Sequence, residues 1–277
     1  MKKSKYRWIY IVATIIIIVI GATVVFAAER PLYFDALDAS TKDAKWLTNQ
    51  PIAHRGYHNE KIAPENSLES FRAAIKKGYA IEMDVLLTKD KQVVVIHDNN
   101  LERLTGKNLN VSDITLEELQ QLRLLDTFSI IPSLTQALEL INGRVPILLE
   151  TKTKGLSHEL DELTYSIIKD YKGLLVVQSF NPASIHWFEK NSPSITRGLI
   201  FSGKYKLDIA NRFVENLSML YSKPNFIAYK YENLLKTDFS KLRKNGLIVL
   251  GWTVNEDMLN SREFTKYCDN IILEAQN

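Results

Sequence analysis

Residues 80–98 read Ala-Ile-Glu-Met-Asp-Val-Leu-Leu-Thr-Lys-Asp-Lys-Gln-Val-Val-Val-Ile-His-Asp. Two apolar runs in this stretch, 80–85 and 93–96, flank a polar turn, which is typical of two β-strands joined by a hairpin. Eight short apolar runs can be counted along the chain, at residues 52–53, 80–85, 146–150, 174–178, 198–201, 226–229, 248–252 and 270–273. The run at 93–96 is not one of the eight and is expected to pair with the second run or extend it.

Longer amphipathic segments separate these runs and predict helices. They cover residues 67–77, 134–141, 158–171, 182–190, 207–221, 234–245 and 256–267. Strands that alternate with helices form parallel sheets, and eight such units close a barrel. The sequence therefore predicts an α/β fold, a (β/α)8 TIM barrel. Residues 99–132 are expected to form an excursion over the barrel mouth, with a short helix near 116–122.

The composition of the 277 residues is that of a globular protein, with 45% hydrophobic and 24% charged residues. The net charge is only +3, and Lys2, Lys3, Lys5 and Arg7 crowd the N-terminus. There is no basic stripe interleaved with aromatic residues, so binding to nucleic acid is not expected. Cys268 is the single cysteine, which excludes an internal disulfide.

Residues 8–28 contain no charged side chain, and a helix of this length would span about 30 Å, the thickness of a bilayer's hydrocarbon core. Basic residues precede it, so the positive-inside rule predicts a single-pass cell-membrane anchor with an extracytoplasmic domain behind it. A signal peptide cleaved after Val25-Phe26-Ala27 is the alternative. The expected parts are 1–30 as basic tip and transmembrane anchor, 31–48 as linker or short helix, and 49–277 as the barrel.

Three carboxylates are expected to cluster inside the barrel. Side chains two apart on a strand point to the same face, so Glu82 and Asp84 both point inward, and Glu150 ends the next run of the barrel. Clustered carboxylates repel and lose hydration, so they need a cation or a shared proton, and oxygen ligands suit Mg2+ or Ca2+. The alternative is a structural ion network in which Glu82 pairs with Lys152 or Arg55.

Two histidines come directly after apolar runs, at the strand ends where such barrels carry their chemistry. Because an imidazole titrates near neutral pH, one of His54 and His97 could accept a proton while the other donates one. Either could instead be an ordinary hydrogen-bonded residue at a strand end. The remaining histidines lie in a loop or in helical segments and are assigned no role: His58, His158 and His186.

Two cationic residues and one aromatic residue complete the candidates. Arg55 offers a fork of donors for phosphate oxygens, and Lys152 should project to the same side as Glu150. Both could equally be partners of the carboxylates. Trp252 ends the seventh run and could present its ring to a glycerol or another small apolar group, or could pack inside the barrel.

Seven short motifs at these positions occur in one order. They are Ala53-His54-Arg55-Gly56, Pro64-Glu65-Asn66-Ser67, Glu82-Met83-Asp84, His97-Asp98, Glu150-Thr151-Lys152, Gln178-Ser179-Phe180 and Trp252-Thr253-Val254-Asn255. With this set and order, the chain resembles the glycerophosphodiester phosphodiesterase family, whose members are phospholipase C-like phosphodiesterases on a TIM barrel. The resemblance covers nearly the whole of the expected barrel.

The resemblance implies a hydrolase that converts a glycerophosphodiester into glycerol 3-phosphate and an alcohol, through a cyclic phosphate. Glu82, Asp84 and Glu150 would hold one divalent cation, Mg2+ or Ca2+. His54 and His97 would act as general acid and general base. Small-molecule glycerophosphodiesters or lysolipids would be the binding partners, besides the membrane itself.

The resemblance also implies substrate-binding residues. Arg55 and Lys152 would bind the phosphate, Glu65 would support the site from the first loop, and Trp252 would line it. One departure stands out, because the family usually ends its last strand in Thr-Asp, whereas residues 271–274 read Ile-Ile-Leu-Glu. The pocket wall formed by the last strand is therefore expected to differ.

Two alternative functions remain open at this point. A lysophospholipase D would use the same residues on a lipid of the anchoring membrane. A catalytically silent, membrane-tethered binding module is suggested by the unusual last strand, although both histidines and all three carboxylates are intact.

Overall fold

The computed structural model describes residue 8, residues 12–16, residue 21, residues 33–203 and residues 208–275. Most of the predicted anchor therefore lies outside the described residues. Among those that are described, no helix is both long enough and apolar enough to cross a membrane. The anchor stays a prediction from the sequence.

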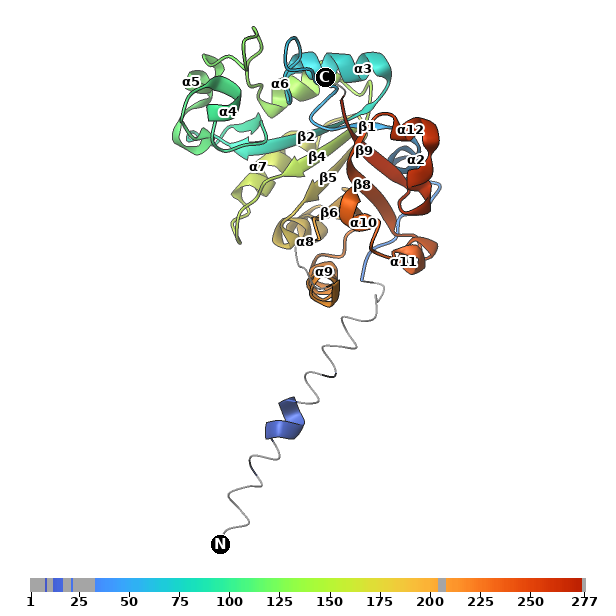
Figure 1. The fold of residues 1–277 in the computed structure, drawn as a ribbon. Helices are drawn as coiled ribbons and strands as arrows, with labels where there is room; N and C mark the ends of the chain where they lie inside the picture. Colours follow the sequence, from blue (N-terminus) through green and yellow to red (C-terminus); the bar gives the residue numbers. More distant parts are fainter. Residues whose placement is uncertain (1–7, 9–11, 17–20, 22–32, 204–207, 276–277) are drawn as a thin grey trace.

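Parallel strands form a closed barrel in sequence order (Figure 1). In the described part of the chain they are β1 (Ile52–Ala53), β2 (Ala80–Leu87), β4 (Ile147–Thr151), β5 (Leu175–Ser179), β6 (Arg197–Phe201), β7 (Phe226–Lys230), β8 (Ile248–Asn255) and β9 (Asn270–Glu274). The barrel closes because β1 pairs with both β2 and β9. β3 (Val93–Val95) pairs antiparallel with β2, as the hairpin pattern indicates. The predicted eight-stranded parallel barrel is confirmed.

Helices cover the outer wall of the barrel (Figure 1). They are α3 (Leu68–Lys77), α6 (Leu134–Ile141), α7 (Glu159–Ile168), α8 (Pro182–Asn191), α9 (Asp208–Ser222), α10 (Tyr231–Leu234), α11 (Ser240–Lys244), α12 (Met258–Ser261) and η2 (Glu263–Lys266). Two predicted helices were too long. The segment 234–245 is interrupted after α10, where Lys236 and Thr237 form turn-like hydrogen bonds to carbonyls three residues earlier. The segment 256–267 breaks at Arg262, which has a left-handed φ of 53°.

The floor of the barrel is closed by α2 (Lys42–Asn49), within the segment for which the sequence suggested a linker or a short helix. Trp46 and Leu47 are buried against side chains that point into the barrel, such as Phe226. Asn270 ties α2 to β9 by donating its side-chain N–H groups to the carbonyls of Leu47 and Gln50, at 2.9 and 2.7 Å. The chain thus enters the domain at the N-terminal ends of the strands.

The excursion between β3 and α6 builds a small core of its own. It contains α4 (Glu102–Thr105), η1 (Val111–Asp113) and α5 (Leu116–Gln120). The side chains of this core come from β2, β3 and the excursion: Leu86, Val94, Ile96, Leu101, Leu104, Val111, Leu119, Leu124 and Ile131. α5 lies within the short helix expected at 116–122. The packing fixes α4 beside the ends of β2 and β3, where the candidate site begins.

Candidate active site

Three carboxylates meet on two adjacent strands of the barrel. Asp84 on β2 is the register partner of Glu150 on β4, and Glu82 lies two residues before Asp84. All three are buried, and each offers an oxygen within 4.8 Å of the others' oxygens. Burial, followed by repulsion from Asp84, raises the pKa of Glu150 to about 7 and raises the pKa of Glu82 well above its usual value. The cluster that the strand alternation predicted is present.

Two cations neutralise part of this charge. Lys152 Nζ lies 2.9 Å from Asp84 Oδ1 and 2.7 Å from Glu150 Oε1. Arg55 donates its backbone N–H to Glu82 Oε2 at 2.8 Å, while its Nε lies 3.6 Å from Asp84 Oδ2. Burial opposes ionisation of Asp84, but Lys152, His97 and Arg55 outweigh it and hold its pKa below the usual range. Asp84 is therefore ionised at neutral pH.

The donor set fits a hard divalent cation. Three carboxylates supply oxygen ligands without any sulfur, as Mg2+ and Ca2+ prefer. Gln178, the register partner of Glu150 on β5, has a buried Oε1 that finds no hydrogen-bond partner among the described residues. A buried carbonyl oxygen without a donor is costly unless something else satisfies it. Gln178 Oε1 thus adds a neutral oxygen, without a donor among the described residues, beside the carboxylate cluster.

His54 is held by a residue from the far end of the chain. Its Nδ1 lies 2.7 Å from Glu274 Oε2, and the other oxygen, Oε1, lies 2.8 Å from His58 Nε2. Burial opposes ionisation of Glu274, but the two histidines outweigh it and lower the pKa of this carboxyl. The residue that made the last strand look unusual is the carboxylate that orients His54. His58, which had no assigned role, shares that carboxylate.

His97 is held by its neighbour in sequence. Its Nδ1 lies 2.6 Å from Asp98 Oδ1, and Asp98 Oδ2 accepts from Arg103 Nε at 2.7 Å. Burial, together with Lys152 and Arg55, lowers the pKa of His97 against the opposing effect of Asp84 and Asp98. Both imidazoles therefore use Nδ1 on a carboxylate, which leaves Nε2 as the nitrogen for proton transfer.

Glu65 ties the first loop to the excursion. One Arg55 N–H group donates to Glu65 Oε1 at 2.8 Å, and two N–H groups of Arg103 donate to both Glu65 oxygens at 2.7 Å. The next residue, Asn66, donates to Asp84 Oδ2 at 2.9 Å. The carboxylate of Glu65 is thus occupied by two guanidinium groups, and it positions Arg55.

The loop that carries His54 and Arg55 needs the glycine after them. Gly56 has a φ of 79°, and a Cβ at this position would lie 2.4 Å from Ser70 Oγ of α3. α3 itself begins at Ser67, whose side chain accepts from Ser70 N. The tight approach of this loop to the start of α3 therefore explains why glycine follows the His-Arg pair.

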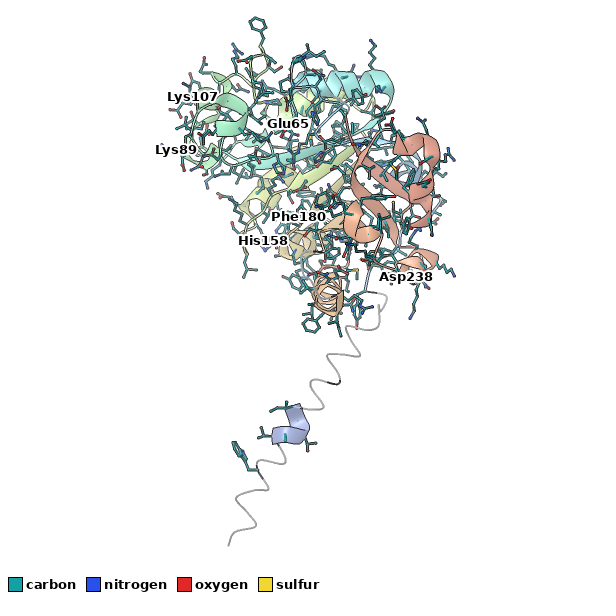
Figure 2. The ribbon with its side chains drawn as sticks, viewed as in Figure 1. Glu65, Lys89, Lys107, His158, Phe180 and Asp238 are labelled. Atoms are coloured by element: carbon teal, nitrogen blue, oxygen red, sulfur yellow. The ribbon has the colours of Figure 1, made fainter. Side chains whose placement is uncertain are left out.

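A cavity of about 280 Å3 joins these groups. Its lining residues are His54, Arg55, Glu82, His97, Glu150, Gln178, Phe180, Ile200, Ala228, Trp252, Thr253 and Ile272. Trp252 meets Phe180 edge to face, with ring centroids 5.7 Å apart. Glu65 and Phe180, both labelled in Figure 2, come from the loop before α3 and the loop after β5. Glu82 and Glu150, both histidines and an apolar wall thus face one space.

A second cavity of about 710 Å3 begins at His97. It is lined by Leu86, His97, Asp98, Asn99, Asn100, Glu102, Arg103, Lys152 and Lys154. Among its lining residues, His97 and Lys152 belong to the carboxylate and histidine network described above. A ligand that filled both cavities would pass His97.

Sequence reasoning missed Glu274, His58 and Arg103 as parts of the site. The spacing of Glu274 and His58 from their partners carries no signal, because strands β1 and β9 meet only when the barrel closes. Asp98 was visible beside His97 in the His-Asp motif, but its orientation toward Nδ1 was not. Trp252 and Lys152 lie in the site where the strand pattern put them.

The model of the glycerophosphoryl diester phosphodiesterase family matches residues 54–273. The chain belongs to this family. The family resemblance expected from the motifs is confirmed, and so is the prediction that the protein is a glycerophosphodiester phosphodiesterase. A glycerophosphodiester phosphodiesterase of Caldanaerobacter subterraneus is 33% identical over 222 residues, covering 75% of this chain and 87% of the relative.

One further relative and two solved structures are also similar to this chain. A lysophospholipase D of Rattus norvegicus is 29% identical over 273 residues, covering 84% of this chain and 85% of the relative. Among solved structures, an Oleispira antarctica phosphodiesterase in complex with the product sn-glycerol-3-phosphate has a TM-score of 0.72 and 26% identity, covering 84% of this chain and 95% of that one. A glycerophosphodiester phosphodiesterase of Thermotoga maritima has a TM-score of 0.64 at 26% identity, covering 82% of this chain and 95% of that one.

Proposed function

We propose that the enzyme hydrolyses glycerophosphodiesters to glycerol 3-phosphate and an alcohol, and that it needs one divalent cation, Mg2+ or Ca2+. One observation carries the proposal: two imidazoles oriented by carboxylates line the same cavity as Glu82 and Glu150, two members of the cluster of three carboxylates. The relatives of known name and the product held by the Oleispira structure support the substrate class.

The two histidines divide the proton transfers between them. Asp98 shares its charge with the permanently cationic Arg103, whereas Glu274 faces only imidazoles. Among the described residues, the carboxylate beside His54 therefore has no guanidinium partner, unlike the carboxylate beside His97. We assign His54 as the base that takes the proton of the substrate's glycerol 2-hydroxyl. His97, which lines both cavities, protonates the leaving alcohol.

The phosphate binds between the cationic groups and the carboxylate cluster. Arg55 Nε is buried without a hydrogen-bond partner among the described residues, so it retains a donor for a phosphoryl oxygen. Lys152 lies beside the same space. A cation held by Glu82, Asp84 and Glu150 would neutralise developing charge on the phosphoryl oxygens. The 2-hydroxyl oxygen attacks phosphorus as the alcohol leaves, and water then opens the cyclic phosphate with the histidine roles reversed.

A lysolipid is a second candidate substrate. Phe180 at the cavity edge is 45% exposed, and Leu156 on the loop after β4 is 81% exposed, so apolar side chains flank the mouth. A named relative from Rattus norvegicus is a lysophospholipase D. Turnover of a lysophosphatidylcholine faster than glycerophosphocholine would favour this substrate.

We also propose that residues 8–28 anchor the chain in the cell membrane, with the barrel on the extracytoplasmic side. The support is the uncharged stretch and the basic residues before it. Protease added to intact cells should remove the barrel domain, and full protection of that domain would contradict the orientation.

The decisive assay measures glycerol 3-phosphate released from glycerophosphocholine by the full chain. Release should occur with Mg2+ or Ca2+, stop with chelator, and be absent in Glu82→Ala. Cation-independent release would remove the metal from the mechanism. Absence of release with either cation, from glycerophosphocholine and from lysophosphatidylcholine, would overturn the proposed reaction.

A further inference from the structure

α9 carries an apolar face on the outside of the barrel. Helices of a barrel bury one face on the strands and turn a polar face to water. In residues 209–222 of α9, whose side-chain exposure is described, the side chains that are more than a third exposed are all hydrophobic or aromatic: Ile209, Val214, Leu217, Leu220 and Tyr221. At 100° per residue these five fall within one arc on the side away from the barrel. We call this set the α9 stripe.

The charged residues within 209–222, the part of α9 whose side chains are described, do not interrupt the stripe. Glu215 is buried and accepts a hydrogen bond from Tyr229 of β7 at 2.7 Å, and Arg212 has a buried Nε. By contrast α3, on the opposite wall of the barrel, exposes charged side chains such as Arg72 and Lys76. Figure 1 shows α3 and α9 at opposite edges of the domain. Exposed apolar surface of this extent on one helix marks a contact surface.

The chain enters the domain beside the end of this helix. Pro224, two residues after α9, accepts from the backbone N–H of Asp35 at 3.0 Å, and Asn225 donates to the Asp35 carbonyl at 2.8 Å. The proposed anchor ends at Ala28, and the seven residues from there to Asp35 reach about 25 Å at most. The C-terminal end of α9 is therefore held close to the surface of any membrane that the anchor crosses.

Exposed lysines surround the same end of the barrel. Lys223 follows α9 directly, and Lys42 and Lys45 project from α2. α2 is tied to this region because Thr196, before β6, donates to Asp43 at 2.6 Å. Lysines beside an apolar helix face are the arrangement by which surface helices bind the headgroup layer of anionic membranes.

We propose that the α9 stripe rests in the interfacial layer of a lipid bilayer, beside the anchor. This proposal rests on the membrane anchor proposed above and not on the phosphodiester chemistry. The active site lies at the opposite ends of the strands from the point where the chain enters. The barrel would thus be fixed on the membrane by its α9 side.

The test places an environment-sensitive fluorophore on Leu217→Cys in the full chain, reconstituted into vesicles of phosphatidylcholine and phosphatidylglycerol. The matched control is Lys76→Cys, in the last turn of α3 on the opposite wall. Cys268 is buried, and labelling of the unmodified chain corrects for it. Brominated lipids quench a fluorophore that contacts them. If the stripe lies at the depth of interfacial helices, they should roughly halve the fluorescence emission at position 217 and leave the emission at position 76 unchanged.

If brominated lipids quenched the fluorophores at positions 217 and 76 equally, the proposal would be overturned, whether or not the protein sediments with the vesicles. Sedimentation of the protein with the vesicles tests the anchor separately, because protein that is not anchored stays in the supernatant. If the unlabelled Leu217→Cys variant formed a disulfide between two copies of the chain, the stripe would bind a second copy of the protein. That result would overturn the proposal. Hydrolysis of soluble glycerophosphocholine by the protein in the same vesicles tests the proposed reaction separately.

Discussion

The two candidate catalytic histidines are oriented alike but are stabilised by different parts of the molecule. His97 bonds to Asp98, the next residue, and Asp98 bonds to Arg103 of the packed excursion. His54 bonds to Glu274, 220 residues away on the strand that closes the barrel. The His97 arrangement is local and includes a guanidinium group, whereas the His54 arrangement depends on barrel closure and pairs its carboxylate with a second imidazole. This difference in the partners of the two carboxylates is the basis for proposing His54 as the base and His97 as the acid.

The largest effect is expected from removing either imidazole. His54→Ala and His97→Ala should each lower kcat by roughly 10²- to 10⁴-fold, the usual contribution of general acid–base catalysis. A substrate with a much better leaving alcohol should rescue His97→Ala and not His54→Ala, because only the acid acts on the leaving group. The opposite rescue would exchange the two roles.

The next largest effect is expected from changing Glu274, the carboxylate that contacts His54 from the last strand. In Glu274→Gln the amide accepts from one imidazole and must donate to the other, so His54 loses both its orientation and its stabilising charge. We expect kcat to fall about 10- to 100-fold with little change in KM, by analogy with the loss of other histidine-orienting groups.

Glu256→Gln is the matched control for that variant. Glu256 is likewise a hydrogen-bonded carboxylate, which accepts from Tyr57, Tyr79 and Lys77, but it lies outside the cavity. Its substitution should leave kcat near that of the unmodified enzyme. Equal losses in both variants would mean that Glu274 has only a structural role.

A smaller effect is expected at His58. It contacts the same carboxylate as His54 but does not line the cavity. His58→Ala should lower kcat only a few-fold, since Glu274 keeps its bond to His54 and loses one of two partners. In a double-mutant cycle, His58→Ala should have no further effect in the Glu274→Gln background. Additive effects would show that His58 acts elsewhere.

The smallest effect concerns stability. The pKa of Glu274 is lower in the folded protein than its usual value, so the ionised form stabilises the fold. That contribution is present above the unfolded pKa of about 4.3 and is lost as the pH falls toward the lower folded pKa. The difference in unfolding temperature between the unmodified chain and Glu274→Gln should therefore shrink when the pH is lowered from 7 to 3. A difference that grows instead would assign the stabilisation to another group.

Much of the site follows from local patterns. Alternation on the second strand turns Glu82 and Asp84 inward, and the ends of parallel strands meet at one rim, which brings Glu150, His54 and His97 there. The same local patterns failed where the backbone changes course without a strong signal, as at Arg262, whose left-handed conformation divides a helix that periodicity alone would continue.

The barrel, the set of strand-end groups and the family can be predicted from the sequence, because they depend on periodicity and on motifs a few residues long. The carboxylate that contacts His54, the sharing of Glu65 between Arg55 and Arg103, and the outward apolar side chains of α9 became known only from the folded chain. Such facts depend on closure of the sheet and on which side of a helix faces its neighbours. Contacts between residues more than two hundred positions apart leave no local sequence pattern from which they could be predicted.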